Sequence, residues 1–363
     1  MVNKQRLVKT FLDLVKIDSP SGEEEKIAKE VAKRLKALGA KVEFDGYGNV
    51  IGKIPGKGEP ILLNAHLDTV EPGRNIKPII DKDRIKSDGT TVLGADPKAG
   101  VSIILETLSS LAEDKTSHIP LEIVFTRGEE SGLFGALNLD YSKITAKRGV
   151  TIDGEEAVHN INISAPGYNR VDVLITGRSA HAGTEPEKGI SAIHIASRII
   201  SQLKLGRIDH ETTANIGIIE GGSAVNAVPE RARFRGEVRS RNLKKLEKHT
   251  RHFQNVFKQV MAKFPEAKVE IDIQREFNPY LFNKDHRVII HMSKTLSQLK
   301  ITPKLVHSGG GTDVNIFHTH GIEAIVVGGC FYNAHTTREY AVISQMVQAT
   351  QFLQKLVSAK LSS

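Results

Sequence analysis

Five side chains of types that bind metal ions lie where predicted strands end or a predicted helix begins. They are His66, Asp96, Glu130, Asp153 and His335. Four of them follow the apolar runs 61–65, 121–125, 149–152 and 324–327. Because side chains at the carboxyl ends of strands in an open α/β sheet converge on one crevice, we expect these five to meet. Three carboxylates and two imidazoles suit a pair of divalent ions, zinc first, with cobalt and manganese as alternatives.

Two further acidic residues adjoin the expected ligands. Glu129 directly precedes Glu130, and adjacent carboxylates at a strand end project differently, so one ligand and one general base explain the pair. Asp68 lies two residues after His66 on the same side of an extended segment, where it can fix the imidazole tautomer. Taken singly, each motif also fits a solvated turn, and Asp96 fits a helix cap. Only their combination points to a metal site.

The segments expected to position these residues alternate between strand and helix as far as Asp153. Residues 3–16 and 24–38 carry apolar side chains at helical spacing, and short strands are expected at 41–44 and 50–53. This alternation is typical of an α/β domain with a mainly parallel sheet, because parallel strands need helical crossovers.

From residue 171 the pattern changes to that of a second, smaller domain. Its strands are expected at 171–175, 213–219, 231–238 and 268–273, and its helices at 191–203 and 242–263. This βαββαβ order is typical of a ferredoxin-like α+β unit. Helices at 287–299 and 344–357 then resume the first domain. We therefore predict a first domain at 1–168 and 277–363, interrupted by an inserted domain at 169–276.

Composition describes an ordinary globular protein of more than one domain. The chain has 363 residues, with 39% hydrophobic and 25% charged side chains. It has no uncharged run long enough for a membrane span and no apolar signal core near its start, so no membrane partner is expected. The single cysteine, Cys330, excludes an intramolecular disulfide and favours a reducing, cytoplasmic location.

The net charge of +8 raises the question of nucleic-acid binding. The basic residues are scattered, however, and aromatic side chains make up only 5% of the chain. In the most basic stretch, 242–263, charges alternate with apolar residues at helical spacing, which is typical of a solvated helix face. No nucleic-acid partner is expected.

The order of the motifs narrows the interpretation. The chain carries in succession His66-x-Asp, Gly-Ala-Asp96-x-Lys-Ala-Gly, Glu129-Glu-x-Gly-Leu-x-Gly-Ala, Asp153-Gly, Ala-His181-Ala-Gly, Gly309-Gly-Gly-Thr-Asp and His335-Thr-x-x-Glu. Together they closely resemble the dinuclear-zinc peptidase family that includes peptidase T, carboxypeptidase G and acetylornithine deacetylase. The resemblance covers nearly the whole chain. The segments 87–96 and 125–133 are most similar to the tripeptidase branch of that family.

The resemblance implies a role for each candidate ligand. His66 and Asp153 would hold one ion, Glu130 and His335 the other, and Asp96 would bridge them. In the same comparison, Glu129 corresponds to the catalytic base and Asp68 to the aspartate that orients a ligand histidine. The fold implied is a mainly parallel-sheet zinc-peptidase catalytic domain with a ferredoxin-like lid.

The resemblance also assigns residues of the inserted domain and of a glycine-rich loop. His181 corresponds to a lid histidine that stabilises the developing oxyanion, and Asn226 and Arg239 correspond to lid positions that bind substrate. Gly310 lies in a segment that resembles the family's loop lining the pocket near the substrate's carboxyl end. The simpler interpretations are a surface histidine, a turn asparagine and a glycine-rich turn. Some relatives form homodimers through the lid, so a homodimer is expected here.

One position departs from the tripeptidase pattern. Relatives carry Asp-Asp-Lys where this chain has Asp96-Pro97-Lys98. The resemblance implies a cis peptide bond after Asp96, which costs about 2.5–4 kcal/mol before most residues but about 0.5–1 kcal/mol before proline. Pro97 is therefore expected to preserve the geometry. The lost carboxylate alters the charge beside the bridging ligand.

These observations predict a metal-dependent exopeptidase, a tripeptidase-like aminopeptidase that hydrolyses short peptides. Within the same metal chemistry the alternative is an N-acyl amino acid amidohydrolase, a deacylase, which requires a blocked amine instead of a free one. An alternative of another class is a peptide-binding protein that has lost catalysis. Pro97 is the one feature that favours this last alternative, and the complete set of ligands with Glu129 argues against it.

Overall fold

A computed structural model describes residues 1–358, which form two compact units. Unit 1 comprises Met1–Ile163, Phe282–Ser308 and the chain from Thr312 onward, and unit 2 comprises Ser164–Leu281 with Gly309–Gly311. Unit 2 thus begins before residue 169 and ends after residue 276, the limits expected from sequence. Its first and last long strands in chain order extend beyond their apolar stretches, and the Gly310 loop, expected in the first domain, belongs to unit 2.

Unit 1 is built on a sheet whose centre is parallel. The strand order is β1-β2-β6-β3-β7-β16-β8-β14, with β15 paired to β8; β14 and the end of β8 fall in the residue range of unit 2. The bounds are β1 Lys41–Phe44, β2 Val50–Ile54, β3 Ile61–His66, β6 Leu121–Thr126, β7 Arg148–Gly154, β8 Asn160–Ala165, β14 Tyr280–Leu281, β15 Lys304–His307 and β16 Glu323–Gly328. The neighbours β6, β3, β7 and β16 run parallel, and antiparallel pairs flank them. The predicted α/β class with a mainly parallel sheet is confirmed.

The helices predicted for unit 1 are present, together with others that were not predicted. They are α1 Lys4–Val15, α2 Glu25–Ala37, α3 Ala95–Glu113, α4 Phe134–Leu137, α7 Arg287–Gln298, α8 Asp313–Thr319 and α9 Ile343–Val357. A smaller sheet, in the order β17-β18-β5-β4, consists of Phe331–Tyr332, Tyr340–Val342, Arg84–Lys86 and Ile79–Asp81. Within residues 1–358, no helix is long and apolar enough to cross a bilayer.

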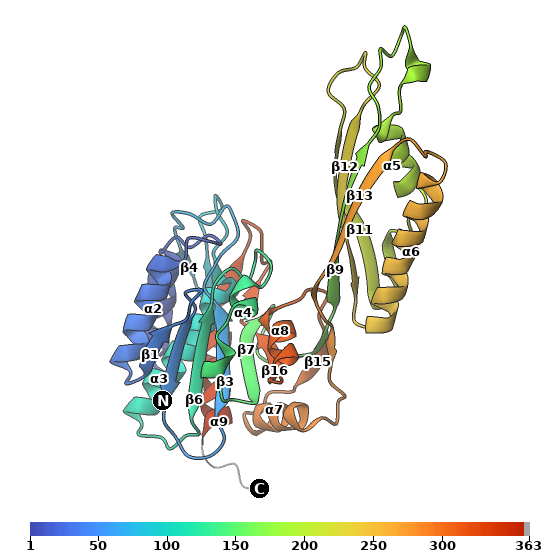
Figure 1. Cartoon of the computed structure of the whole chain (residues 1–363). Coiled ribbons are helices and arrows are strands. Elements are labelled where there is room, and N and C mark those ends of the chain that lie inside the picture. The colour runs from blue at the N-terminus through green and yellow to red at the C-terminus, as the bar shows by residue number, and fades with distance from the viewer. Residues whose placement is uncertain (359–363) are drawn as a thin grey trace. The chain divides into compact units, whose positions relative to one another are not determined.

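The centre of unit 1 holds the ends of several strands against one helix. Every residue of β3 and β6 is buried, as expected for parallel strands covered on both faces, and Figure 1 shows them beside β7. Helix α3 contacts both β3 and β7. At Gly100 the helix approaches so closely that an added Cβ would lie 2.2 Å from the Ile152 carbonyl oxygen. This close approach sets the segment of Asp96 beside the strand of Asp153.

Unit 2 has the predicted βαββαβ order with one additional short strand. Its sheet runs β10-β11-β12-β9-β13, and α5 and α6 lie along the same side of it (Figure 1). The bounds are β9 Gly167–Thr176, α5 Ala192–Ile200, β10 Gly206–Asp209, β11 Thr212–Gly221, β12 Arg231–Ser240, α6 Leu243–Met261 and β13 Lys268–Phe277. Apolar residues of both helices and of alternate strand positions form one core, which explains the amphipathic stretch 242–263.

Candidate metal centre and active site

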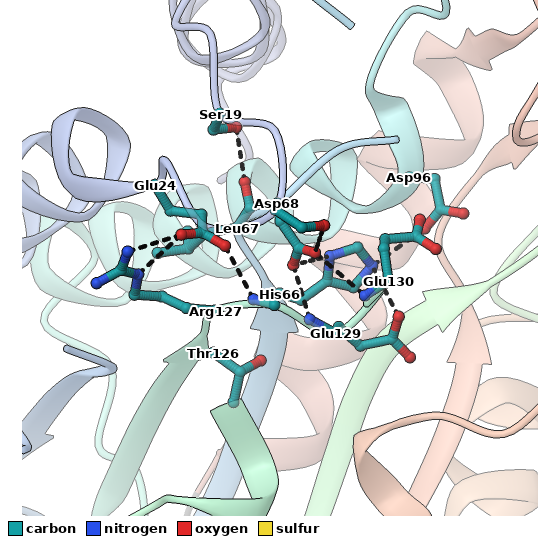
Figure 2. Close-up of polar contacts among 12 residues, drawn as sticks. Ser19, Glu24, His66, Leu67, Asp68, Asp96, Thr126, Arg127, Glu129 and Glu130 are labelled. Atoms are coloured by element: carbon teal, nitrogen blue, oxygen red, sulfur yellow. Dashed lines mark hydrogen bonds and ion pairs between the residues drawn. The ribbon is translucent and has the colours of Figure 1, made fainter. Parts of the chain in front are cut away.

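The five predicted ligands come together in unit 1. His66 ends β3, Asp153 lies near the end of β7, and Glu130 follows β6 by four residues. Donor atoms within 4.8 Å of one another form the sets His66–Asp96–Asp153 and Asp96–Glu130–His335, and a third set joins His66 to Glu129 and Glu130. Figure 2 shows His66, Glu129 and Glu130 turned toward one another, with Asp96 beside Glu130.

Asp96 occupies the position between the two histidines. Its Oδ1 lies 3.4 Å from His66 Nε2, and its Oδ2 lies 3.4 Å from His335 Nε2. On one side, His66 Nε2 is also 3.3 Å from an Asp153 oxygen. On the other, His335 Nε2 is 2.9 Å from Glu130 Oε1. The two sets therefore share one carboxylate, each through a different oxygen.

The electrostatics of the cluster favour positive charge. Although burial opposes it, the carboxylates around His66, Asp153 foremost, raise the pKa of this imidazole well above its ordinary value. Hydrogen bonds with Asp96 and Glu130 raise the pKa of His335 to about 10. Burial raises the pKa of Asp153 to about 7. A buried set of carboxylates that stabilises cationic imidazoles also stabilises divalent cations, so the donor set fits two such ions.

Glu129 has the properties of a proton acceptor. Its side chain is buried, and Oε2 lies 3.9 Å from His66 Nε2. Burial and the nearby carboxylates of Asp153 and Asp313 raise the pKa of Glu129 well above its ordinary value, while His66 acts in the opposite direction. A carboxylate with a raised pKa beside a metal site suits general base catalysis.

Asp68 contacts the backbone of Glu129 and Glu130 as well as His66, the one partner that the sequence predicted. Its Oδ1 lies 3.1 Å from His66 Nδ1, which leaves Nε2 of that ring facing the other ligands. The same carboxylate accepts hydrogen bonds from the backbone N–H groups of Glu129, at 3.0 Å, and Glu130, at 3.1 Å. Ser21 Oγ donates a further bond of 2.7 Å. Asp68 thus fixes one ligand histidine and the backbone of the acidic pair together.

Arg127, whose role could not be assigned from sequence, belongs to the support of this same turn. Its guanidinium pairs with Glu24 and Glu25, each at 2.8 Å, as Figure 2 shows for Glu24. Glu24 also accepts a bond of 3.0 Å from the N–H of Gly128. Gly128 has a φ of 62°, the left-handed region that favours glycine. The pair therefore anchors the sharp turn that leads into Glu129.

Sequence reasoning gave no role to two buried carboxylates that adjoin the site. Glu339 accepts hydrogen bonds from three backbone N–H groups, including that of Asp96 at 2.9 Å. Asp313 accepts bonds from Thr126 and Asn64, and burial raises its pKa to about 6. Both residues stand at the ends of motifs noted in the sequence, Gly309-Gly-Gly-Thr-Asp and His335-Thr-x-x-Glu. Their place in those motifs was the sequence feature that could have indicated a role for Glu339 and Asp313.

Backbone geometry around two ligands is unusual. The Asp96–Pro97 peptide bond is cis, as the resemblance implied. His335 has a φ of 61°, a left-handed conformation that is uncommon for a residue with a side chain. A left-handed residue with a side chain persists where the surrounding structure enforces it, and such residues concentrate at functional sites.

The predicted catalytic histidine, His181, and the predicted substrate-binding residues all belong to unit 2. His181 Nδ1 accepts bonds from the N–H groups of Gly183, at 3.2 Å, and Thr184, at 3.1 Å, so the neutral ring carries its proton on Nε2. Asn226 lies in the adjacent segment, where its carbonyl oxygen accepts the N–H of Ala182 at 3.0 Å. The structure therefore brings His181 and Asn226 together.

Arg239 and Gly310 stand apart from that pair within unit 2. Arg239, on β12, makes an ion pair of 3.0 Å with Glu237 and lies over the ring of Tyr168 at 4.8 Å. Gly310 lies in the loop Gly309–Gly311, outside the regular elements of unit 2.

The fold and the site define a metal-dependent hydrolase with an inserted domain. Comparison with known proteins shows the family of hydrolases to which it belongs. Residues 163–265 match the family described as Peptidase dimerisation domain. The chain is 37% identical to the uncharacterized protein YqjE of Bacillus subtilis, over 98% of this chain and 99% of that one. It is also 26% identical to peptidase T of Clostridium novyi, over 97% and 98% of the two chains.

Two solved structures are similar over almost their full length. An aminopeptidase PepT from Bacillus cereus has 36% identity and a TM-score of 0.90, with 98% of each chain covered. A tripeptidase from Staphylococcus aureus has 34% identity and a TM-score of 0.93, with 99% of this chain and 98% of that chain covered. The chain belongs to the M20 family of metallopeptidases, on the peptidase T-like side of that family.

Proposed function

We propose that this chain is a tripeptidase-like aminopeptidase that releases the N-terminal residue from short peptides. The observation that carries the proposal is the pair of ligand sets that share Asp96, with Glu129 buried beside them. The names of the similar structures, an aminopeptidase and a tripeptidase, support the same substrate class. Neither the deacylase nor the inactive peptide-binding protein is favoured by these relatives.

The proposed cofactor is a pair of divalent ions, zinc first. His66 and Asp153 would hold one, Glu130 and His335 the other, and Asp96 would bind both. When bound, such ions polarise a peptide carbonyl and acidify water.

The chain's own residues would move the protons. Glu129 removes a proton from the attacking water and delivers it to the leaving amine, which its raised pKa supports. Asp68 keeps His66 oriented and the Glu129 backbone in place. His181 would donate its Nε2–H to the developing oxyanion, and the tautomer fixed by Gly183 and Thr184 supports that role. Asn226, Arg239 and Gly310 would bind the peptide.

A homodimer through unit 2 is part of the proposal. The strand β10 pairs with β11 only over Thr212–Ala214, so within residues 1–358 the rest of that β11 edge has no strand partner. Ile218 and Ile219 on this edge are exposed, as is Ile193 on α5. An apolar open strand edge is a surface suited to pairing with a second chain. The match to a dimerisation domain supports this interface.

A cytoplasmic location is proposed on the strength of the single cysteine. Cys330 is buried, and burial raises its pKa to about 12, so it has the character of a structural thiol.

A substrate panel tests the proposed class. Free tripeptides and N-acetyl amino acids are incubated with the full chain and zinc, cobalt or manganese, with and without a chelator. The proposal predicts chelator-sensitive turnover of the free tripeptides. Turnover of the acetylated substrates alone would make the protein a deacylase, and tight tripeptide binding without turnover would make it a binding protein.

A further inference from the structure

Glu339 is a buried carboxylate that the proposed mechanism does not use. Its exposed fraction is 1%. Oε2 accepts the N–H groups of Leu93, at 2.7 Å, and Gly94, at 2.8 Å, while Oε1 accepts the N–H of Asp96 at 2.9 Å. A carboxylate that accepts several short backbone bonds is held firmly, and it holds its donors in turn.

The donors belong to a turn whose shape depends on Glu339. Gly94 has a φ of 69° and precedes α3, so the N–H groups of Leu93, Gly94 and Asp96 face the same carboxylate. A Cβ at Gly94 would lie 3.2 Å from Thr69 Oγ1, which leaves little freedom to reshape the turn. Asp96 follows directly and takes its direction from this turn.

Glu339 itself stands four residues after His335, just before β18. It therefore connects two segments that each supply a ligand to the set Asp96–Glu130–His335. His335 lies in an irregular turn with a left-handed backbone, and its side chain is 53% exposed. No regular strand or helix holds this histidine, unlike His66 at the end of β3.

The burial of Glu339 is costly, and stability alone gives no reason for it. A buried carboxylate contributes less to stability than an apolar side chain of similar size. Burial lowers the pKa of Lys98 to about 8, Glu339 is the carboxylate that opposes this shift most, and Lys98 Nζ donates to the Ile17 carbonyl oxygen at 3.3 Å. The carboxylate is satisfied chiefly by the ligand-bearing turn.

We propose that Glu339 is a positioning residue that couples Asp96 to His335, so that the set Asp96–Glu130–His335 binds its divalent ion tightly only when Glu339 joins the two segments. The set His66–Asp96–Asp153 depends on it less, because β3, β7 and Asp68 hold its other members. The inference rests on the proposed function only through the assignment of the ligands.

The test uses the full chain with Glu339→Gln, which keeps the size of the side chain but turns an amide NH2 toward one of the donors. Zinc binding is measured by calorimetric titration against a competing chelator, and cobalt absorption reports on the two ion environments. We expect two ions per chain, with one dissociation constant raised about 10–100-fold and the other little changed.

The matched control is Glu122→Gln. Glu122 is also buried and accepts the N–H groups of Thr145 and Ala146, each at 2.9 Å, but it lies at the opposite end of β6 from the ligands. This control should lower thermal stability without separating the two metal affinities.

If Glu339→Gln does not fold, Glu339→Asp keeps the charge on a shorter side chain and should weaken the same ion selectively. Equal weakening of both ions, or unchanged affinities with a lower melting temperature, would overturn the inference for either variant. The measured metal affinities do not depend on whether the chain cleaves peptides. Wild-type chain that binds two ions but cleaves no peptide would refute the peptidase proposal alone.

Discussion

At the scale of single residues, substitution of Glu129 should reduce catalysis without reducing metal binding. Glu129→Gln keeps the size of the side chain but removes the proton acceptor. We predict a fall in kcat/KM toward a tripeptide of about 10²–10⁴-fold, the usual contribution of a general base. Metal content, measured on the same preparation, should stay at two ions per chain, because the two ligand sets that share Asp96 do not include Glu129.

The control for this substitution is again Glu122→Gln, which leaves the site untouched and should retain activity. Full metal-dependent activity in Glu129→Gln would show that another group takes the proton. Loss of both activity and metal would instead make Glu129 a ligand, as the third donor set with His66 and Glu130 allows.

Residue types at strand ends were enough to predict which candidate ligands lie together, but not the groups that hold them. His66, Asp153 and Glu130 could be predicted because a polar residue after a buried apolar run has a defined place in a parallel sheet. Glu339 could not be given a role, because its donors are backbone N–H groups more than two hundred positions earlier in the chain. Such partners leave no trace in residue type or spacing.

At the scale of elements, the contact of α3 with β7 sets the spacing of the site. Gly100→Ala places a methyl group 2.2 Å from the Ile152 carbonyl oxygen, so the helix must move away from the strand. We predict destabilisation of about 1–3 kcal/mol, as for other overpacked positions, measured by urea unfolding. Weaker zinc binding should accompany it, because Asp96 and Asp153 lie on either side of this contact.

Gly46→Ala is the matched control, because a Cβ there has no neighbour within 4 Å and the backbone has an ordinary φ. It should leave both stability and zinc binding unchanged. Equal stability of the two variants would contradict the close contact between α3 and β7.

Long, periodic elements were predicted well, and short exposed ones were not. The helices α1, α2, α7 and α9 and the buried strands β3 and β6 carry clear apolar patterns, whereas the short helices α4 and α8 were not predicted. Asp96 was expected where a helix begins, and the helical segment does start at Ala95, although its first turn is irregular at Asp96 and Pro97. The strands β4 and β5 were not predicted, because each has three residues and little buried apolar surface.

At the scale of the whole molecule, the open edge of β11 should control assembly. Ile219→Lys places a charge on this edge, where a partner strand would otherwise pair. We predict that the wild-type chain is a dimer by light scattering and that this variant is a monomer. Ile290→Lys, on α7 of unit 1, is the control. The two isoleucines are similarly exposed, at 57% and 53%.

A dimer that survives Ile219→Lys but not Ile290→Lys would place the interface on unit 1 instead. The division into two units could be foreseen from the change in pattern near residue 171. Its limits could not be placed to the residue, because β9 and β13 continue into polar positions that lack an apolar pattern and are joined by backbone bonds and by ion pairs such as that of Arg170 with Glu276.

The central claim is that this chain removes the N-terminal residue of a short peptide with the help of bound metal. The most direct test is mass spectrometry of the products from a tripeptide of three different residues, before and after metal is removed and restored. The account predicts a free N-terminal amino acid and the remaining dipeptide, lost with the chelator and regained with zinc, cobalt or manganese. Release of the C-terminal residue instead, or cleavage that is indifferent to the chelator, would contradict it.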